Sequence, residues 1–292
     1  MGTLRRSLLI CSSLILLVST SAADPSIRQE TIAGPHGVKW TRTITSCDVP
    51  GSGADIATAV TGSRGANQYL WLDRNHLNAI TEHVAITGVG GYGVAGWWLN
   101  SMRASLYKVP GGTGNPDWIH PLPLADFQIT VDADLLGDRL TTTARHESLF
   151  VFDAGFPDPI FSDWFSPPYA GRNCGVSDDG TTFAGAGGNP TGVGGEVRVH
   201  NATTGALRFV RSLPAPPEGL SVSGDGLVVA TNVRGFVKIW AAITGALRDS
   251  VAIPGETQTP AVLSEDGSYL VTGGFSRTVR LYHWNGTDYI QD

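Results

Sequence analysis

The feature that most constrains this 292-residue chain is a unit that recurs along it. Its clearest copy, residues 223–247, contains a Ser-Gly-Asp-Gly turn, an apolar strand, a glycine turn, a second strand and a closing Thr-Gly pair. The same order returns from Ser264 and, earlier in the chain, from Ser177. Because a single short unit cannot bury its own apolar faces, neighbouring copies are expected to stack and to form the core between them.

The spacing of the units indicates how many strands each one holds. Six turn glycines are equivalent in the pattern: Gly53, Gly91, Gly137, Gly180, Gly226 and Gly267. They lie about 43 residues apart on average, within the period of about 40–45 residues that is typical of a four-stranded propeller blade. We therefore expect an all-β fold, a β-propeller of about six four-stranded antiparallel blades. A seventh blade would follow if the N-terminal segment or sequence beyond Asp292 added one.

The fifth unit allows the strands to be predicted one by one. We expect strands over 219–223, 227–231, 236–240 and 247–253, with a two-residue Asp-Gly turn joining the first two. In the sixth unit, residues 288–290 are expected to form the outer strand. The best candidate for a helix, His76–His83, is short and β-branched toward its end.

The N-terminus predicts a targeting segment that is separate from the fold. Arg5 and Arg6 precede the apolar run 8–18, and small residues end it before Asp24, which is the pattern of a cleaved secretory signal peptide over 1–23. We expect a leader over 24–38, with a strand near Glu30 that could close the ring, and a propeller domain over 39–292. The expected location is secreted, periplasmic or extracellular.

Charge and composition narrow the class of partner. The formal net charge is −6, and loss of Arg5 and Arg6 with the signal peptide would take it to −8. Such a surface disfavours nucleic acid and anionic membranes as partners, and we expect no stable membrane insertion. Only 16% of the residues are charged and 37 are glycine, which suits short strands joined by tight turns.

The acidic residues of the repeat are interpreted as turn residues. Asp tolerates and Gly readily adopts the positive φ that tight turns require. We therefore assign structural turn roles, with no catalytic or metal-binding role, to the following residues: Asp179, Gly180, Asp225, Gly226, Asp266 and Gly267. No motif for a zinc protease, a serine nucleophile or a phosphate-binding loop occurs. We accordingly predict no catalytic residue, no metal ligand and no cofactor.

The two cysteines outside the signal peptide leave alternatives open. An oxidising compartment favours a disulfide between Cys47 and Cys174. Both, however, lie six residues before a turn glycine, three units apart, which in a symmetric six-blade ring places them on opposite walls. A disulfide requires Cα atoms within about 7 Å, so symmetry disfavours this one. Asn201 and Asn285 begin glycosylation sequons if the source is eukaryotic, and otherwise read as turn residues.

The repeat resembles two families of propeller proteins. A Ser-x-Asp-Gly turn, a strand, a glycine turn and the sequences at 237–240 and 279–282 resemble WD40-type repeats, although the Trp-Asp dipeptide is not preserved. The segment 240–245, with its Thr-Gly turn, is similar to repeats of pyrroloquinoline-quinone-type propellers. The first resemblance implies a protein-binding scaffold. The second implies a larger enzyme with a bound quinone.

These observations lead to three hypotheses for function. The first is a secreted or cell-surface scaffold that binds an unknown protein or small ligand on one propeller face without catalysis. The second is a propeller enzyme of the quinone-dependent dehydrogenase or hydrolase class, and the third is a structural fragment of a longer secreted protein. If the chain binds a partner, the segments that the repeat does not need are the expected place: 110–123, 156–172 and 187–195.

Overall fold

The computed structural model describes the chain from Ser26 to Asp292, with gaps. The described residues are 26–31, 41–46, 57–60, 79–86, 92–99, 103–108, 118–121, 129–134, 139–144, 148–153, 155–254, 261–273 and 278–292. Within these ranges every regular element is a β-strand. None of them contains a helix long and apolar enough to cross a membrane.

The described strands form six antiparallel sheets, one of three strands and five of four. In the five four-stranded sheets, consecutive strands pair in sequence order, as in a meander. The first three sheets are β1–β3 (Ser26–Thr31, Thr41–Ser46, Ala57–Val60), β4–β7 (Ala79–Ile86, Tyr92–Leu99, Arg103–Lys108, Trp118–Pro121) and β8–β11 (Ile129–Ala133, Arg139–Ala144, Ser148–Asp153, Phe161–Trp164). The last three are β12–β15 (Ala170–Val176, Thr182–Gly188, Gly195–Asn201, Leu207–Leu213), β16–β19 (Gly219–Val222, Val228–Val233, Phe236–Ala241, Leu247–Ala252) and β20–β23 (Ala261–Leu263, Tyr269–Gly273, Val279–Trp284, Tyr289–Gln291).

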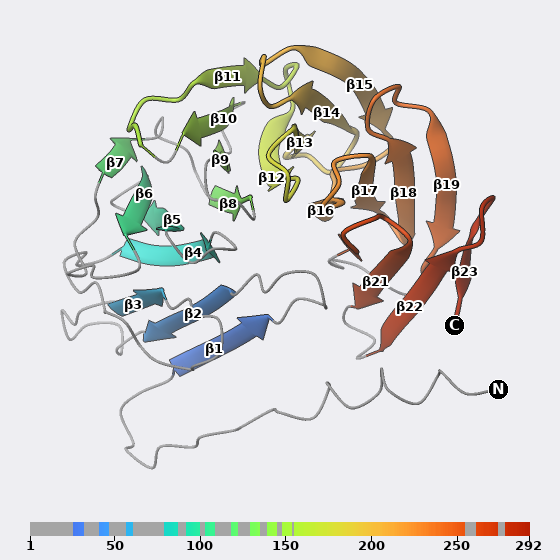
Figure 1. Cartoon of the computed structure of the whole chain (residues 1–292), viewed down its shortest axis with the longest axis horizontal. Coiled ribbons are helices and arrows are strands. Elements are labelled where there is room, and N and C mark those ends of the chain that lie inside the picture. The colour runs from blue at the N-terminus through green and yellow to red at the C-terminus, as the bar shows by residue number, and fades with distance from the viewer. Residues whose placement is uncertain are drawn as a thin grey trace.

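The sheets follow one another around a common centre (Figure 1), as propeller blades do. From the third sheet onward, the first strand of a sheet contacts the first two strands of the preceding sheet. Thus β12 lies against β8 and β9, β16 against β12 and β13, and β20 against β16 and β17. The predicted all-β, propeller-like fold of repeated four-stranded antiparallel sheets is confirmed. The first and last sheets are the two ends of this arc, and no strand is shared between them.

The predicted strands of the fifth unit are confirmed to within two residues. The structure has β16 at Gly219–Val222, β17 at Val228–Val233, β18 at Phe236–Ala241 and β19 at Leu247–Ala252. The outer strand expected over 288–290 is β23. The agreement follows from local chemistry, because Asp-Gly and Thr-Gly turns fix where each strand must end.

Three expectations near the N-terminus need correction or refinement. The helix candidate His76–His83 is wrong from residue 79 onward, because β4 occupies Ala79–Ile86 and pairs with β5 along its length. An apolar pattern of eight residues is too short to establish a helical period, so the pairing with β5 determines the conformation of this segment. The leader strand exists as β1, but it pairs with β2 and not with the last sheet.

The first unit is also out of step with the others. Gly53 lies between β2 and β3, which are the second and third strands of their sheet. The other five turn glycines lie between the first and second strands of theirs. The repeat pattern predicts that the strand before Gly53 is the first of its sheet. The first sheet instead contains one more strand, β1, before it.

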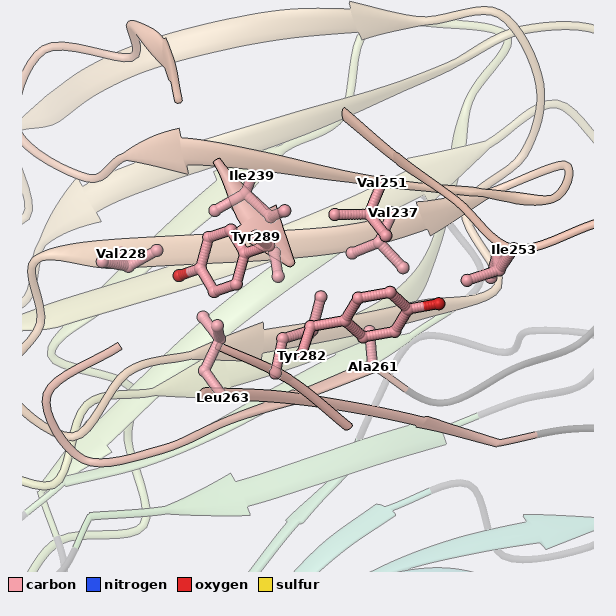
Figure 2. Close-up of a cluster of buried hydrophobic side chains, with 11 residues drawn as sticks. Val228, Val237, Ile239, Val251, Ile253, Ala261, Leu263, Tyr282 and Tyr289 are labelled. Atoms are coloured by element: carbon pink, nitrogen blue, oxygen red, sulfur yellow. The ribbon is translucent and has the colours of Figure 1, made fainter. Parts of the chain in front are cut away.

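The core lies between successive sheets, and Figure 2 shows the part between the fifth and the sixth. Val237 and Ile239 of β18 are fully buried there, against Tyr282 of β22 and Tyr289 of β23. A second cluster joins the fourth sheet to the fifth and includes Trp240. Each large aliphatic side chain buried in this way stabilises the fold by about 1.5–3 kcal/mol. Packing between sheets is therefore the main source of stability.

The Asp-Gly turn of the fifth sheet gives the first testable prediction. Gly226 has φ 68°, and a Cβ at this position would lie 2.7 Å from Thr182 Oγ1 of the preceding sheet. Gly226→Ala is expected to lower the free energy of unfolding by about 1–2 kcal/mol or more, since both backbone strain and a steric clash are added. Urea denaturation measures the loss. Gly273→Ala is the matched control, because its Cβ would meet no atom closer than 3.7 Å. Equal losses in the two variants would contradict the prediction.

Candidate functional site

The Ser-x-Asp-Gly turns are closed hydrogen-bonded loops. In the fifth sheet, Ser223 Oγ donates to Asp225 Oδ1 at 2.6 Å, and the backbone N–H of Val228 donates to Ser223 Oγ at 2.9 Å. The same serine-to-aspartate bond occurs from Ser177 to Asp179 at 2.5 Å and from Ser264 to Asp266 at 2.8 Å. The turn glycines of all three loops have φ between 65° and 68°.

The carboxylates of these turns are occupied within the turns themselves. Asp266 accepts bonds from the backbone and the hydroxyl of Ser268 and from Ser264. These bonds, those from Ser268 first, lower the pKa of Asp266 to about 2. Asp179 likewise accepts from the backbone and the hydroxyl of Thr181. The structure thus places the predicted turn residues where turn geometry alone accounts for them.

The turns also connect neighbouring sheets. The N–H of Asp179 donates to the carbonyl of Gly224 at 3.2 Å, and the N–H of Asp225 donates in the same way to Glu265 at 2.7 Å. Within the sixth sheet, Tyr289 of β23 donates its hydroxyl to the carbonyl of Gly267 in the turn between β20 and β21. The repeating polar residues therefore form the seam between blades.

A buried polar cluster, which sequence reasoning missed, lies between the third and fourth sheets. Asp163 of β11 accepts from Arg198 Nε at 2.6 Å and lies 2.9 Å from His200 Nε2. Arg198 also contacts Glu196 at 3.3 Å. The alternation Glu196-x-Arg198-x-His200 places three ionisable side chains on one face of β14, and this period of two was the signal in the sequence.

The cluster holds a segment in place and encloses its histidine. His200 is 1% exposed, stacks on Phe183 with 4.8 Å between ring centroids, and has Nδ1 3.2 Å from the carbonyl of Gly205. Each ring nitrogen therefore lies close to an oxygen, Nε2 to Asp163 Oδ2 and Nδ1 to the carbonyl of Gly205. Glu196 accepts from the N–H of Ser166 at 2.7 Å, so the same cluster fixes the chain that leaves β11.

The electrostatics of the cluster favour a charged Asp163. Burial opposes its ionisation, but hydrogen bonds from His200 and Arg198 outweigh burial and lower the pKa of Asp163 from about 3.8 to about 2. Arg198 and Asp163 are both largely buried. Such pairs are strongly destabilising to break, because one buried charge is then left alone.

Two of the predicted insertions meet at one end of the sheets. We define the loop end as residues 166–169, 189–194, 214–217 and 234–235, where strands two and three of a sheet connect and where one sheet leads to the next. A Cβ on Gly194 would lie 3.0 Å from Tyr169 Oη, and one on Gly188 would lie 2.5 Å from Pro216 Cβ. The backbones are thus packed as closely as glycine allows.

Hydrogen bonds give the loop end a defined shape. Asn189 accepts from the N–H of Gly192 through its carbonyl and from the N–H of Thr191 through its side chain, at 2.9 Å each. Arg234, in the turn of the fifth sheet, donates to the carbonyl of Gly192 at 2.8 Å. This bond joins the loops of two neighbouring sheets.

The surface of the loop end is weakly charged and rich in proline. Tyr169 is half-buried, Val193 is 67% exposed, and Arg234 is exposed. The exposed prolines are Pro167, Pro168, Pro190 and Pro214. Tyr and Arg are enriched at protein interfaces, and rigid prolines lose little entropy on binding. Of the third predicted insertion, 110–123, only β7 (Trp118–Pro121) is described, and the remainder lies outside the described residues.

The innermost strands of two sheets are interrupted by β-bulges. Glu82 is the extra residue in β4, between Thr81 and His83. Arg172 is the extra residue in β12, between Gly171 and Asn173. Bulges of this kind redirect side chains and are common beside binding sites. Both lie on strands nearest the centre of the arc.

The remaining predicted residues lie apart from the loop end. Asn201 and Asn285 begin turns between the third and fourth strands, where each side chain accepts two backbone N–H bonds. Cys174 is a free, buried cysteine whose Sγ lies 3.3 Å from the carbonyl of Thr130. Cys47 lies outside the described residues, so its pairing stays a prediction.

The environment of Cys174 predicts an inert thiol. Burial raises the pKa of Cys174 to about 12, so the reactive thiolate is scarce at neutral pH. We expect no alkylation of Cys174 in the folded protein at pH 8 and complete alkylation after unfolding in urea. Mass spectrometry of the peptide that contains Cys174 measures both. Recovery of this peptide disulfide-linked to Cys47 would contradict the packing described here.

The buried cluster predicts a particular dependence of stability on pH. Because the folded pKa of Asp163 lies below its ordinary value, its contribution is present above about pH 4 and is lost as the pH falls toward 2. Asp163→Asn should therefore be clearly less stable than the natural protein at pH 7, and the difference should narrow between pH 4 and pH 2. Urea titrations across this range measure it, with Asp158→Asn, an exposed aspartate of the same segment, as control. A difference that stays constant with pH would count against this account.

Comparison with known proteins adds no relative to this picture. No model of a protein family matches the chain, and no curated protein is significantly similar to it. The chain is a propeller-like protein of repeated four-stranded antiparallel sheets.

Proposed function

We propose that the chain is a secreted or cell-surface β-propeller that binds a protein or ligand through its loop end, without catalysis. One observation carries the proposal. Two segments that the repeat does not need, 156–172 and 187–195, converge on a single surface and are fixed there by bonds to Glu196 and Arg234. These two segments are not needed to build the blades, and yet they are held in a defined shape.

The chemistry of the surrounding residues supports binding over catalysis. The carboxylates of the repeat are engaged in turns, and the ring of His200 is buried and stacked on Phe183. The loop end instead presents Tyr169, Val193 and several prolines in a preorganised arrangement. Preorganisation reduces the entropy lost on association, which is the main obstacle to affinity for a small surface.

The family assignment belongs to this proposal as well. The Ser-x-Asp-Gly turns and the strand at 237–240 support a WD40-like chain whose repeats are degenerate. The Thr-Gly turns support a quinoprotein-like one, since Gly205 and Gly245 take the same conformation, with φ 71° and 67°. The corresponding second candidate is a quinone-dependent dehydrogenase. Addition of pyrroloquinoline quinone and calcium would then produce dye-linked activity and a rise in Tm, and the absence of both would exclude it.

The binding proposal predicts which variants lose a partner. The natural protein, purified after secretion, is used to capture partners from the extracellular fraction, and each candidate is then purified and its Kd measured. The double variant Tyr169→Ala with Val193→Asp is expected to weaken binding about tenfold or more, because hot-spot residues each contribute about 1–2 kcal/mol.

The matched control lies at the opposite end of the same sheets. Leu227→Asp changes a side chain that is 51% exposed beside the Asp-Gly turn. It should leave the Kd unchanged, and Tm should be similar in both variants. Loss of binding in the control, but not in the double variant, would move the site to the turn end and overturn the assignment.

A further inference from the structure

One face of the last sheet is apolar and open to solvent. Val262 of β20, Val271 of β21 and Leu281 of β22 are 55%, 37% and 40% exposed. The strand register places Val262 opposite Val271 and Val271 opposite Leu281, so the three side chains form one row. Ile290 of β23 pairs with His283, two residues beyond Leu281, and therefore lies on the same face, where it is 45% exposed. We call these four residues the open face.

The equivalent positions in the two preceding sheets are completely buried. Counting from the turn glycine, Val271 corresponds to Ala230 in the fifth sheet and Ala184 in the fourth, and both are 0% exposed. Leu281 corresponds to Ile239 and Val199, which pair with those alanines and are also 0% exposed. The open face is therefore a blade interface without its neighbour.

The interface between the fifth and sixth sheets shows what kind of surface covers such a face. In the fifth sheet, Ala230 and Ile239 are covered by the sixth sheet, from which Leu263, Tyr282 and Tyr289 project (Figure 2). The first strand of the covering sheet lies across the first two strands of the sheet that it covers. The occupant of the open face should accordingly be another sheet of this type.

The area of the open face indicates whether a second copy of the chain or a segment of the same chain covers it. Four strands about 4.8 Å apart and about five residues long give a face of roughly 15 Å by 15 Å. This is far smaller than the roughly 800 Å² that each partner buries in a stable complex. Within one chain, a covalent connection supplies an effective concentration in the millimolar range, so a small contact suffices.

We propose that the first sheet of this chain, β1–β3, packs on the open face and closes the array without strand exchange. The first sheet is the other end of the arc in Figure 1, and the last sheet already contains four strands of its own. Closure therefore takes place face to face, as at every other blade interface. It also removes an exposed apolar surface that would otherwise promote aggregation.

Composition makes this interface weaker than the one between the fifth and sixth sheets. The sixteen residues of β1–β3 include only three large aliphatic ones, Ile27, Ile44 and Val60. The covering strands of the fifth and sixth sheets supply leucine, valine, tyrosine and tryptophan instead. Because stabilisation follows the apolar area that is buried, the closing contact is expected to open before the interface between the fifth and sixth sheets.

Hydrogen exchange of the full-length protein tests the closure. Leu281→Glu and, separately, Val271→Glu place a charge on the open face. Both should accelerate amide exchange in peptides that cover β1–β3 by about tenfold or more, since burying a charge at the contact excludes packing. Peptides from β12–β19 should keep their protection, which shows that the rest of the array is folded. Ile243→Glu, 61% exposed on a turn of the fifth sheet, is the matched control and should change neither.

Two outcomes would overturn the proposal. Exchange in β1–β3 that is identical in the natural protein and in both open-face variants would show that the first sheet does not depend on this face. A mass by light scattering that rises with concentration in the natural protein and is monomeric in Leu281→Glu would assign the face to a second copy instead. The expected result is a monomer in all four proteins.

Discussion

The packing of one sheet on the next is the interaction on which the rest of this structure depends. A four-stranded sheet with two apolar faces has no stable existence alone. Ile239 is fully buried only because Tyr282 and its neighbours in the following sheet cover it. A buried aliphatic side chain contributes about 1.5–3 kcal/mol, whereas a hydrogen bond contributes a net 0.5–1.5 kcal/mol, so roughly speaking packing dominates. The bonds between turns, such as the one from the N–H of Asp225 to the carbonyl of Glu265, instead link the turn of each sheet to the turn of the next.

This division of roles separates scaffold from site. The polar residues that recur are committed to turns and to the seam between blades, which is why they recur. The loop end differs from sheet to sheet, and its shape comes from contacts that occur once, such as Arg234 with Gly192 and Ser166 with Glu196. A surface that is unique within a repeating molecule can distinguish partners, which a repeating turn cannot. Binding at the loop end is therefore consistent with a scaffold whose blades are otherwise alike.

The sequence predicts this fold wherever the relevant interaction is local. Asp225-Gly226 fixes a turn within four residues, so β16 and β17 could be located closely from the sequence. The cluster of Asp163 with Arg198 and His200 could not, because it joins residues 35 and 37 positions apart through the packing of two sheets. The alternation along β14 indicated a polar face but not its partner. The first sheet was misplaced for a related reason: its turn signal at Gly53 is weak, so the position of β1 depends on pairing with β2 and not on the repeat.

The buried carboxylates link the stability of the fold to the shape of the loop end. Replacing a buried ion pair with apolar side chains of similar size often leaves a protein equally stable, so stability alone does not explain why Asp163 and Arg198 are charged. Their geometry suggests a positioning role. Arg198 contacts both Asp163 and Glu196, and Glu196 holds Ser166 at the start of the loop end. An apolar core could bury the same area but could not fix the direction in which the chain leaves β11. Since its hydrogen bonds keep the pKa of Asp163 near 2, this arrangement should persist at any pH above about 4.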